Sequence, residues 1–307
     1  MQVAGLRVWL TIVIFGCLLL GFSLAAASQQ AVSAASPEIR VENWVGNIFI
    51  VLPLEAEAKE KGYPFSLVKP APDLQIPGSR NTKSAWLEGK ELRVLKVQLL
   101  AVTKDDPPMK DYLIFFEAVA DGSVITAEAQ GGQVHHVVLA SDFTAAKQYF
   151  LGKTVFSKRP AISQYKETPG FISVRVDEPL KVEDVILGAE TSQPIWLVVT
   201  TADGKKGYIA IAFSNTNAHQ GIERKEIPWA NRIFEQNPRD LHQWPEEVWA
   251  AISRSEVKPG MIPDQVRLSW GEPDYVEDMP LGEQRWYYPG KLLNFKERSL
   301  YSVEDRI

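Results

Sequence analysis

Alternating apolar and polar residues dominate the middle of the chain. Apolar and polar side chains alternate along Leu92–Val97 and Leu180–Val185, which is the pattern of a strand with one buried face. Asp121-Gly122 and Asp203-Gly204 each lie between apolar, β-branched runs, where a tight hairpin turn is expected. Short strands joined by tight turns predict small β-barrels or sandwiches.

The middle of the chain also repeats itself in the same order. The matched pairs are "VGNIFIVLP" from Val45 with "LGKTVFSKRP" from Leu151, "GKELRVLKVQLL" from Gly89 with "DEPLKVEDVILG" from Asp177, and "FFEAVADGSVITAEA" from Phe115 with "LVVTTADGKKGYIAIA" from Leu197. The spacing between matches shrinks along the chain, so the first copy has the longer loops. Two related β modules in tandem are therefore predicted.

A helical pattern separates the two copies. In "SDFTAAKQYF", Asp142 has the side chain of an N-cap residue, and Phe143, Ala146 and Phe150 share one helical face. This predicts a short connector helix. After the second copy the chain becomes polar and rich in Asn, Gly and Pro, which predicts a linker with a brief helix around Trp229 to Phe234.

The C-terminal pattern begins with two helices. Residues 244–254 combine a proline near the start, acids in the first turn and an apolar stripe, which predicts an amphipathic helix. In "KPGMIPDQVRLSWGEP", Pro263 fits the first turn of a second helix and Gly271 fits its C-terminal cap. Val266 and Trp270 lie one turn apart on its apolar face.

The remainder, "GEQRWYYPGKLLNFKERSLYSV", alternates as two or three strands around a Pro289-Gly290 turn. The predicted fold is therefore α+β and mostly β, with two tandem small β-barrel modules followed by an ααβββ two-layer domain. The predicted divisions are a signal peptide or N-terminal anchor (1–27), a tether (28–40), a first β module (41–141), a connector helix with the second β module (142–215), a linker (216–240) and the ααβββ domain (241–307).

The N-terminal sequence predicts export. Arg7 precedes an uncharged apolar run from Val8 to Leu24 and three alanines, which is the plan of a secretory signal peptide. The run also reaches the low end of a membrane span, so an uncleaved anchor is the alternative. Both alternatives place the remainder in the periplasm or outside the cell. Cleavage after Ala27 removes Cys17, the single cysteine, and excludes disulfides and thiol chemistry from the mature chain.

Composition narrows the function classes. The chain is 45% hydrophobic and 23% charged, as expected of a globular protein. Its formal net charge is −5, and it has no cluster of Lys and Arg. The electrostatic footprint expected of a nucleic-acid-binding protein is therefore missing.

Two resemblances follow from these motifs. The spacing "PLKVEDV…PIWLVVTTADGKKGYIAI" resembles the bacterial Src-homology-type small β-barrels of exported proteins. The C-terminal segment resembles the small α+β domain of the SmpA/OmlA outer-membrane assembly lipoproteins and of related β-lactamase-inhibitor-like domains. The residues that carry this second resemblance are Gly260, Met261, Val266, Gly271, Pro273, Trp286 and Tyr288. Together the resemblances imply a noncatalytic interaction protein of the cell envelope.

Enzyme and metal motifs are missing from the sequence. The histidines are His135, His136, His219 and His242, and the adjacent pair would point to opposite faces of a strand, so no metal site is predicted. The familiar motifs of proteases, hydrolases, nucleotide sites and calcium loops do not occur. The acid pairs Asp105-Asp106 and Asp177-Glu178 could serve as acid and base, but solvated loops explain them better. No cofactor is predicted.

Tryptophans and lysines give the candidate interaction surface. Trp86, Trp229 and Trp286 are candidate contact residues, and Lys205 with Lys206 could add a cationic edge. Trp196, Trp249 and Trp270 are instead expected to fill cores. The predicted function is a noncatalytic binding or scaffold protein of the bacterial cell envelope that acts on a protein partner or an envelope polymer. The alternatives are an acid/base hydrolase of an envelope substrate and a periplasmic enzyme inhibitor.

Overall fold

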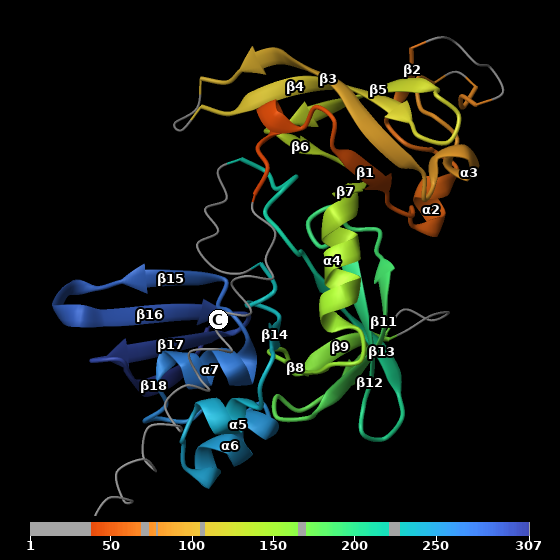
Figure 1. Ribbon diagram of the computed structural model, residues 1–307. Coiled ribbons are helices and arrows are strands. Elements are labelled where there is room, and N and C mark those ends of the chain that lie inside the picture. The colour runs from red at the N-terminus through yellow and green to blue at the C-terminus, as the bar shows by residue number, and fades with distance from the viewer. Residues whose placement is uncertain are drawn as a thin grey trace, which may run out of the picture. The chain divides into compact units, whose positions relative to one another are not determined.

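Three antiparallel sheets carry most of the regular structure (Figure 1). The computed structural model describes residues 38–68, 74–77, 79–104, 108–164, 170–220 and 228–306. The prediction of an α+β, mostly β fold is confirmed. The expected leader, most of the expected tether, and Asp105 and Asp106 lie outside the described residues. No helix of the described part is both long and apolar enough to cross a membrane.

The first sheet is formed by strands from the first predicted repeat unit. Its strands are β1 (Ile48–Val51), β2 (Ser66–Leu67), β3 (Glu91–Val102), β4 (Lys110–Ala118), β5 (Val124–Gln130), β6 (Gln133–Val134) and β7 (Val137–Leu139), accompanied by the short helices η1 (Val41–Asn43), α2 (Ala56–Lys59) and α3 (Ser84–Leu87). Phe116 from β4 and Phe49 from β1 meet in the core with ring centroids 6.2 Å apart. Gly122 has φ +72° in the β4–β5 turn, so the predicted Asp-Gly hairpin is confirmed.

The second sheet follows a connector helix. The elements are α4 (Ala140–Phe150), β8 (Thr154–Ser157), β9 (Ala161–Gln164), β10 (Phe171–Ser173), β11 (Leu180–Leu187), β12 (Ile195–Thr200), β13 (Lys206–Ile211) and β14 (Ile233–Phe234). Gly204, at φ +83°, occupies the β12–β13 turn in the predicted way. One face of this sheet is apolar and buried, with Leu197, Val199 and Ile211 fully enclosed.

The two sheets have the same strand order. The first runs β2-β5-β4-β3-β1-β7 and the second runs β9-β13-β12-β11-β8-β14, with β10 added at the β9 edge. All these neighbours are antiparallel. The three sequence matches fall on corresponding elements: β1 with β8, β3 with β11, and the β4–β5 hairpin with β12–β13. The internal repeat of the sequence is thus a repeat of topology.

The connector helix differs from its prediction at the N-terminus. Helix α4 starts at Ala140, so Asp142 lies in its first turn and is not the N-cap. Its carboxylate is buried and accepts a hydrogen bond from the Ser214 hydroxyl at 2.5 Å. Ala146 and Phe150 are buried on the expected face. The position of the Asp142 side chain is determined by Ser214, 72 residues later, and the local sequence pattern could not indicate this partner.

The predicted linker is packed wherever it is described. Residues 229–234 form a turn and then β14, so the helix predicted there is wrong. Trp229 is 1% exposed and stacks on Phe213 with ring centroids 4.8 Å apart. Asn217 is also buried. The polar composition predicted a solvated linker, but the few aromatic and amide side chains in it pack against the two sheets. A four-residue helix, α5 (Pro238–Leu241), follows.

The C-terminal unit has two helices and four strands. Its elements are α6 (Glu246–Ser253), α7 (Pro263–Trp270), β15 (Tyr275–Asp278), η2 (Pro280–Gly282), β16 (Glu283–Tyr288), β17 (Lys291–Lys296) and β18 (Ser299–Asp305), with the strands in sequential order. Both helices begin and end as predicted, and Gly271 caps α7 at φ +85°. The predicted ααβββ order missed β15, because its short "YVED" carries two acids and gives a weak strand signal.

Candidate functional site

The tryptophans chosen from the sequence are not a shared surface. Trp229 and Trp286 are each 1% exposed, so their assignment as contact residues is wrong: both fill cores. Trp286 packs on Phe295 with ring centroids 4.7 Å apart. Trp86 lies against the core of the first module, with the Lys90 ammonium 4.2 Å from its ring centroid. Of the tryptophans expected in cores, Trp249 is buried at 3% exposure.

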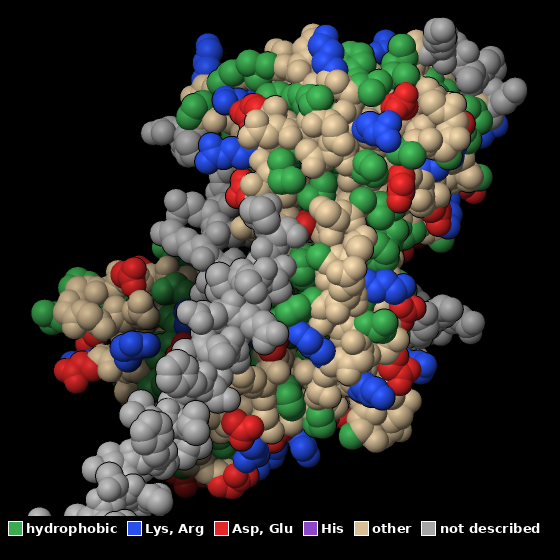
Figure 2. Space-filling view, in the orientation of Figure 1, with side chains coloured by type: hydrophobic (Ala, Val, Ile, Leu, Met, Phe, Trp, Pro, Cys, Tyr) green, Lys and Arg blue, Asp and Glu red, His purple; other side chains and the backbone are tan. Residues whose placement is uncertain are grey.

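The two candidate lysines lie on the β12–β13 hairpin, away from those tryptophans in the fold. Lys205 is exposed and forms an ion pair with Asp203 at 2.7 Å. Lys206 pairs with Glu183 at 2.9 Å. On the face drawn in Figure 2, basic and acidic side chains are intermixed. These lysines are therefore part of a mixed-charge surface.

The adjacent histidines lie in the turn between β6 and β7, and the strand predicted for them is wrong. His136 has φ +61°, and its backbone N–H donates to the Thr191 hydroxyl at 2.9 Å. Burial, with a smaller contribution from His135, lowers the pKa of His136. Among the described residues no three His, Cys, Asp or Glu side chains are grouped so that they could hold a metal.

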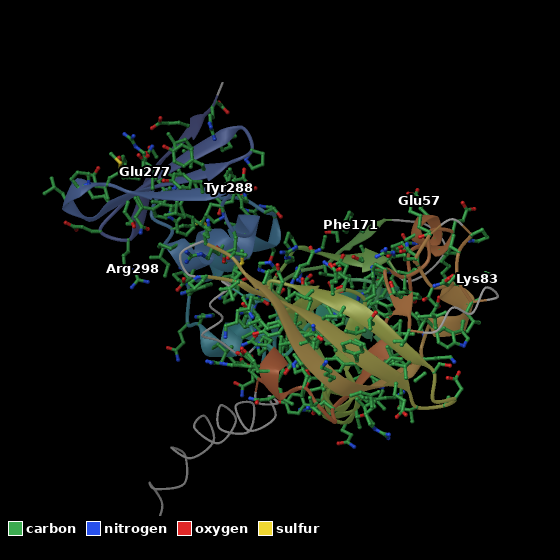
Figure 3. All side chains as sticks on the ribbon, turned by 90° about the horizontal axis from the view of Figure 1, so that it is seen from above. Glu57, Lys83, Phe171, Glu277, Tyr288 and Arg298 are labelled. Atoms are coloured by element: carbon green, nitrogen blue, oxygen red, sulfur yellow. The ribbon has the colours of Figure 1, made fainter. Side chains whose placement is uncertain are left out.

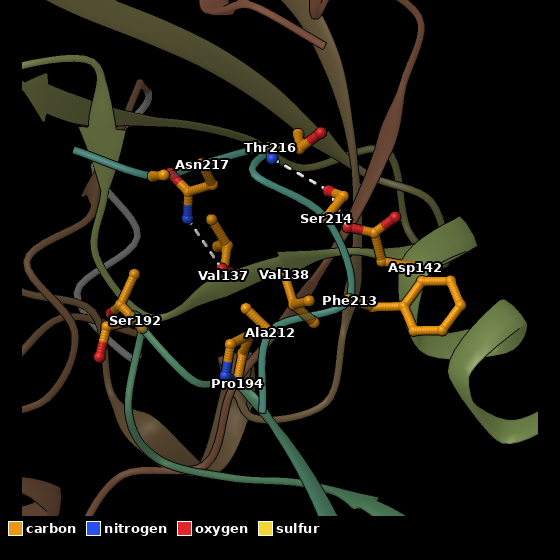
Figure 4. A pocket seen from close by; sticks show the side chains of 12 residues that line it. Val137, Val138, Asp142, Ser192, Pro194, Ala212, Phe213, Ser214, Thr216 and Asn217 are labelled. Carbon is orange, nitrogen blue, oxygen red and sulfur yellow. Dashed lines mark hydrogen bonds between the residues drawn. The ribbon is translucent and has the colours of Figure 1, made fainter. Parts of the chain in front are cut away.

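One small cavity lies where the chain leaves the second sheet (Figure 4). Its volume is about 20 Å³, room for one water molecule. The Asn217 side chain beside it donates to the carbonyls of Val134 and Val137 at 2.8 and 2.9 Å and accepts from the Val134 N–H at 2.7 Å. The Asn217 amide thus makes the hydrogen bonds that a neighbouring strand would make, and it attaches the segment after β13 to β6 and β7. The cavity belongs to a structural joint.

A wider hollow lies beside η1, with a volume of about 440 Å³. One of its lining carboxylates, Glu42, accepts hydrogen bonds from Tyr112 at 2.6 Å and Lys110 at 3.0 Å. The Tyr112 hydroxyl is the main reason that the pKa of Glu42 falls to about 2. The group is therefore ionised and already engaged within the chain, which suits a structural ion pair.

A groove of about 200 Å³ lies on the outer face of the second sheet. Ser163 of β9 is paired with Phe171 of β10 on one side and with Tyr208 of β13 on the other. Directly paired residues of antiparallel strands point to the same face, so a small side chain lies between two aromatic ones. In the next row Ala210 is paired with Trp196. The small side chains form a floor, and the aromatic side chains form the walls.

The aromatic walls differ in rigidity. Trp196 and Tyr208 stack with ring centroids 4.0 Å apart and planes 5° apart. Gly188 makes room for the indole, because a Cβ at that position would lie 1.9 Å from the Trp196 Nε1 atom. Opposite them Phe171 is 80% exposed, the most exposed aromatic residue of the described chain (Figure 3). One wall is therefore fixed, and the other is an apolar ring in solvent.

The end of the groove is cationic. Ile233 of β14 is paired with Ser157 of β8, and the Lys158 N–H donates to the Arg232 carbonyl at 2.9 Å, which brings Arg232 beside the turn that carries Arg159. The Ser157 hydroxyl braces this turn through hydrogen bonds with the Arg159 carbonyl and N–H. Burial first, and Arg159 second, lower the pKa of Arg232, while Glu190 opposes them. Arg232 stays charged but is poorly compensated.

The groups that line the groove are suited to binding. Glu190 is the one carboxylate among the described residues that line it, and no histidine lines it. General acid–base catalysis needs a titratable group within hydrogen-bond reach of the reacting proton, with a pKa near the working pH. A pair of arginines beside aromatic walls instead recognises a flat anion and apolar side chains.

Part of this site is visible in the pattern of the strands. Ala161, Ser163, Tyr208 and Ala210 occupy alternate positions of two strands, and small outward residues between aromatic ones indicate a trough. Trp196, which the pattern predicts in a core, is half-buried and forms a groove wall.

A scan against models of protein families, a search of curated proteins and a search of solved structures each found no match to this chain.

Proposed function

We propose that this is a noncatalytic binding or scaffold protein of the bacterial cell envelope, and that the groove on the second sheet is where a protein partner docks. The observation that carries this proposal is a partly exposed sheet face with small residues between the exposed Phe171 and the Trp196–Tyr208 stack. Exposed aromatic residues are enriched at interface hot spots. The volume of about 200 Å³ is below the range typical of small-molecule pockets, about 300–1,000 Å³, and suits one or two side chains.

The fold supports the same proposal at a coarser level. The common strand order of the two sheets supports their interpretation as duplicated small barrels of the bacterial Src-homology type. Two helices followed by an antiparallel sheet support the resemblance of residues 241–307 to the SmpA/OmlA domain. The apolar N-terminal sequence supports an envelope location, either periplasmic or tethered to the membrane.

The test is affinity capture from an envelope extract with the chain from Ser28 onward. Phe171→Ser and Tyr208→Ser alter the groove, and Tyr275→Ser alters an equally aromatic, 62% exposed position on the C-terminal sheet. We expect specific proteins to be lost by both groove variants and retained by the Tyr275 variant. Equal recovery by all four chains would contradict the proposal.

The competing enzyme hypothesis gives a different result in a parallel assay. Incubation with envelope polymers and peptides would release product, and an alanine in place of Asp177 or Glu178 would abolish release without unfolding the chain. In the structure Asp177 accepts a hydrogen bond from Arg239 at 2.6 Å, which suits a structural ion pair.

A further inference from the structure

We infer that the groove recognises a carboxylate next to a large apolar side chain, within an extended protein segment. This inference rests on the proposed function and names the chemistry of its ligand. Asp or Glu side chains and the carboxyl end of a chain are two sources of the same group.

The charge of the groove points to an anion. Arg159 and Arg232 line one end, and the single carboxylate there, Glu190, is exposed. Within the described ranges neither guanidinium has an ion pair to any carboxylate at 4.0 Å or less. A half-buried cation loses hydration, and a bound anion would offset that loss. Two adjacent guanidinium groups present planar donor forks that fit a carboxylate.

The apolar part of the ligand follows from the strand spacing. Phe171 and Tyr208 lie two strands apart, about 10 Å between their backbones at about 4.8 Å per strand. The Ser163 side chain between them is too short to fill that space. One aromatic or branched aliphatic side chain would fit there in contact with both rings, and a neighbouring carboxylate would reach the arginines at the groove end. An extended segment supplies both groups without folding.

A purely structural role for Arg232 makes the opposite prediction about stability. If the guanidinium served the fold, Arg232→Gln would lower the free energy of unfolding. We expect no net loss, because the structure describes no hydrogen bond or ion pair of the Arg232 side chain, and the removal of a buried charge and of repulsion from Arg159 offsets the lost attraction to Glu190. A residue that costs the fold nothing when removed, yet controls ligand affinity, is placed for binding.

Titration of labelled peptides tests the inference with the chain from Ser28 onward. The probes are capped hexapeptides with a central Asp-Val-Phe, the same peptides with Asn-Val-Phe, and a third set whose one carboxylate is the C-terminus after Val-Phe. We expect Asp to bind about tenfold or more tightly than Asn, where tenfold corresponds to about 1.4 kcal/mol. Arg159→Gln and Arg232→Gln should bring the ratio close to one. Arg285→Gln, an exposed arginine on β16, is the matched control. Comparison of the first and third sets distinguishes the two carboxylate sources.

Each other result is decisive. If Asp and Asn peptides bind equally and Tyr208→Ala weakens both, the carboxylate inference fails while the docking groove stands. If no peptide binds, or if Phe171→Ala and Tyr208→Ala leave the peptide affinity unchanged, the inference is overturned. Preference for a phosphorylated peptide or for soluble peptidoglycan fragments over the Asp set would also overturn it, because the ligand would then belong to a different class.

Discussion

Gly188→Ala tests whether the fixed wall of the groove is built as described. Gly188 directly follows β11 and lies against the Trp196 indole, and an added Cβ would lie 1.9 Å from Nε1, 2.2 Å from Cε2 and 2.4 Å from Cδ1. Cβ atoms do not approach other heavy atoms this closely, so the indole must move. The indole also stacks on Tyr208, so its movement disrupts the wall.

The expected loss of stability is about 1–2 kcal/mol. Overpacking of a well-fitted contact typically costs about 1–3 kcal/mol. If the indole rotates outward instead, about 0.5–1.5 kcal/mol of ring stacking is lost. Against this, Ala reduces the entropy of the unfolded chain, which stabilises by about 0.4–1 kcal/mol. At the middle of these ranges a steric cost of about 2 kcal/mol exceeds an entropic gain of about 0.7 kcal/mol, so a net loss of about 1 kcal/mol is expected.

Urea unfolding followed by far-ultraviolet circular dichroism measures this loss, with Trp196→Ala as the reference background. In that background the clash is gone, so Gly188→Ala should be neutral or stabilising. Equal destabilisation in both backgrounds, or none in the wild type, would refute the packing described for Gly188 and Trp196.

Three further predictions address the fold. Trp229→Ala should lower the free energy of unfolding by about 3–5 kcal/mol, because a fully buried indole is removed. Urea unfolding measures this loss. A loss below about 1 kcal/mol would mean that residues 228–234 are a solvated linker and are not packed as described. Gly271→Val should cost about 1 kcal/mol or more by the same assay, because φ is +85° there, and no loss would contradict that cap. The pKa of His136 is lowered from 6.5, so the unfolded state binds the proton more readily and stability should fall as the pH drops below about 6.5. Unfolding measured at pH 7.5 and 5.5 should show a smaller fall in stability for His136→Asn than for the wild type. An equal fall would contradict the burial of this histidine.

Local chemistry made part of the fold predictable from the sequence. The Asp-Gly hairpins need a residue with positive φ, and Gly122 and Gly204 supply it. Pro263 and Gly271 mark the ends of α7 for equally local reasons. The internal repeat predicted two related units, and the common strand order agrees with it.

Long-range packing decided the rest. Trp229 and Asn217 lie in a polar stretch, and their burial depends on partners far away in sequence, such as Phe150 and Val134. Asp142 has the side chain of an N-cap, but its hydrogen-bond partner is Ser214, 72 residues later in the sequence. Composition alone cannot reveal such partners.

The groove illustrates the same limit. Phe171, Ser163 and Tyr208 come from three strands, and only the register of those strands places them in one row. The alternation of each strand predicted which residues face outward. It could not predict which outward residues become neighbours, and two of the tryptophans predicted as contact residues, Trp229 and Trp286, are core residues.

Photo-crosslinking in living cells tests the docking groove most directly. Position 171 should accept a benzophenone amino acid, because the Phe171 side chain is 80% exposed. The same amino acid at position 275 is the control. We predict that irradiation links position 171 to one defined envelope protein, that position 275 gives no such product, and that Arg232→Gln reduces the yield at 171. Equal products from both positions, or none from 171, would contradict a docking site on the second sheet.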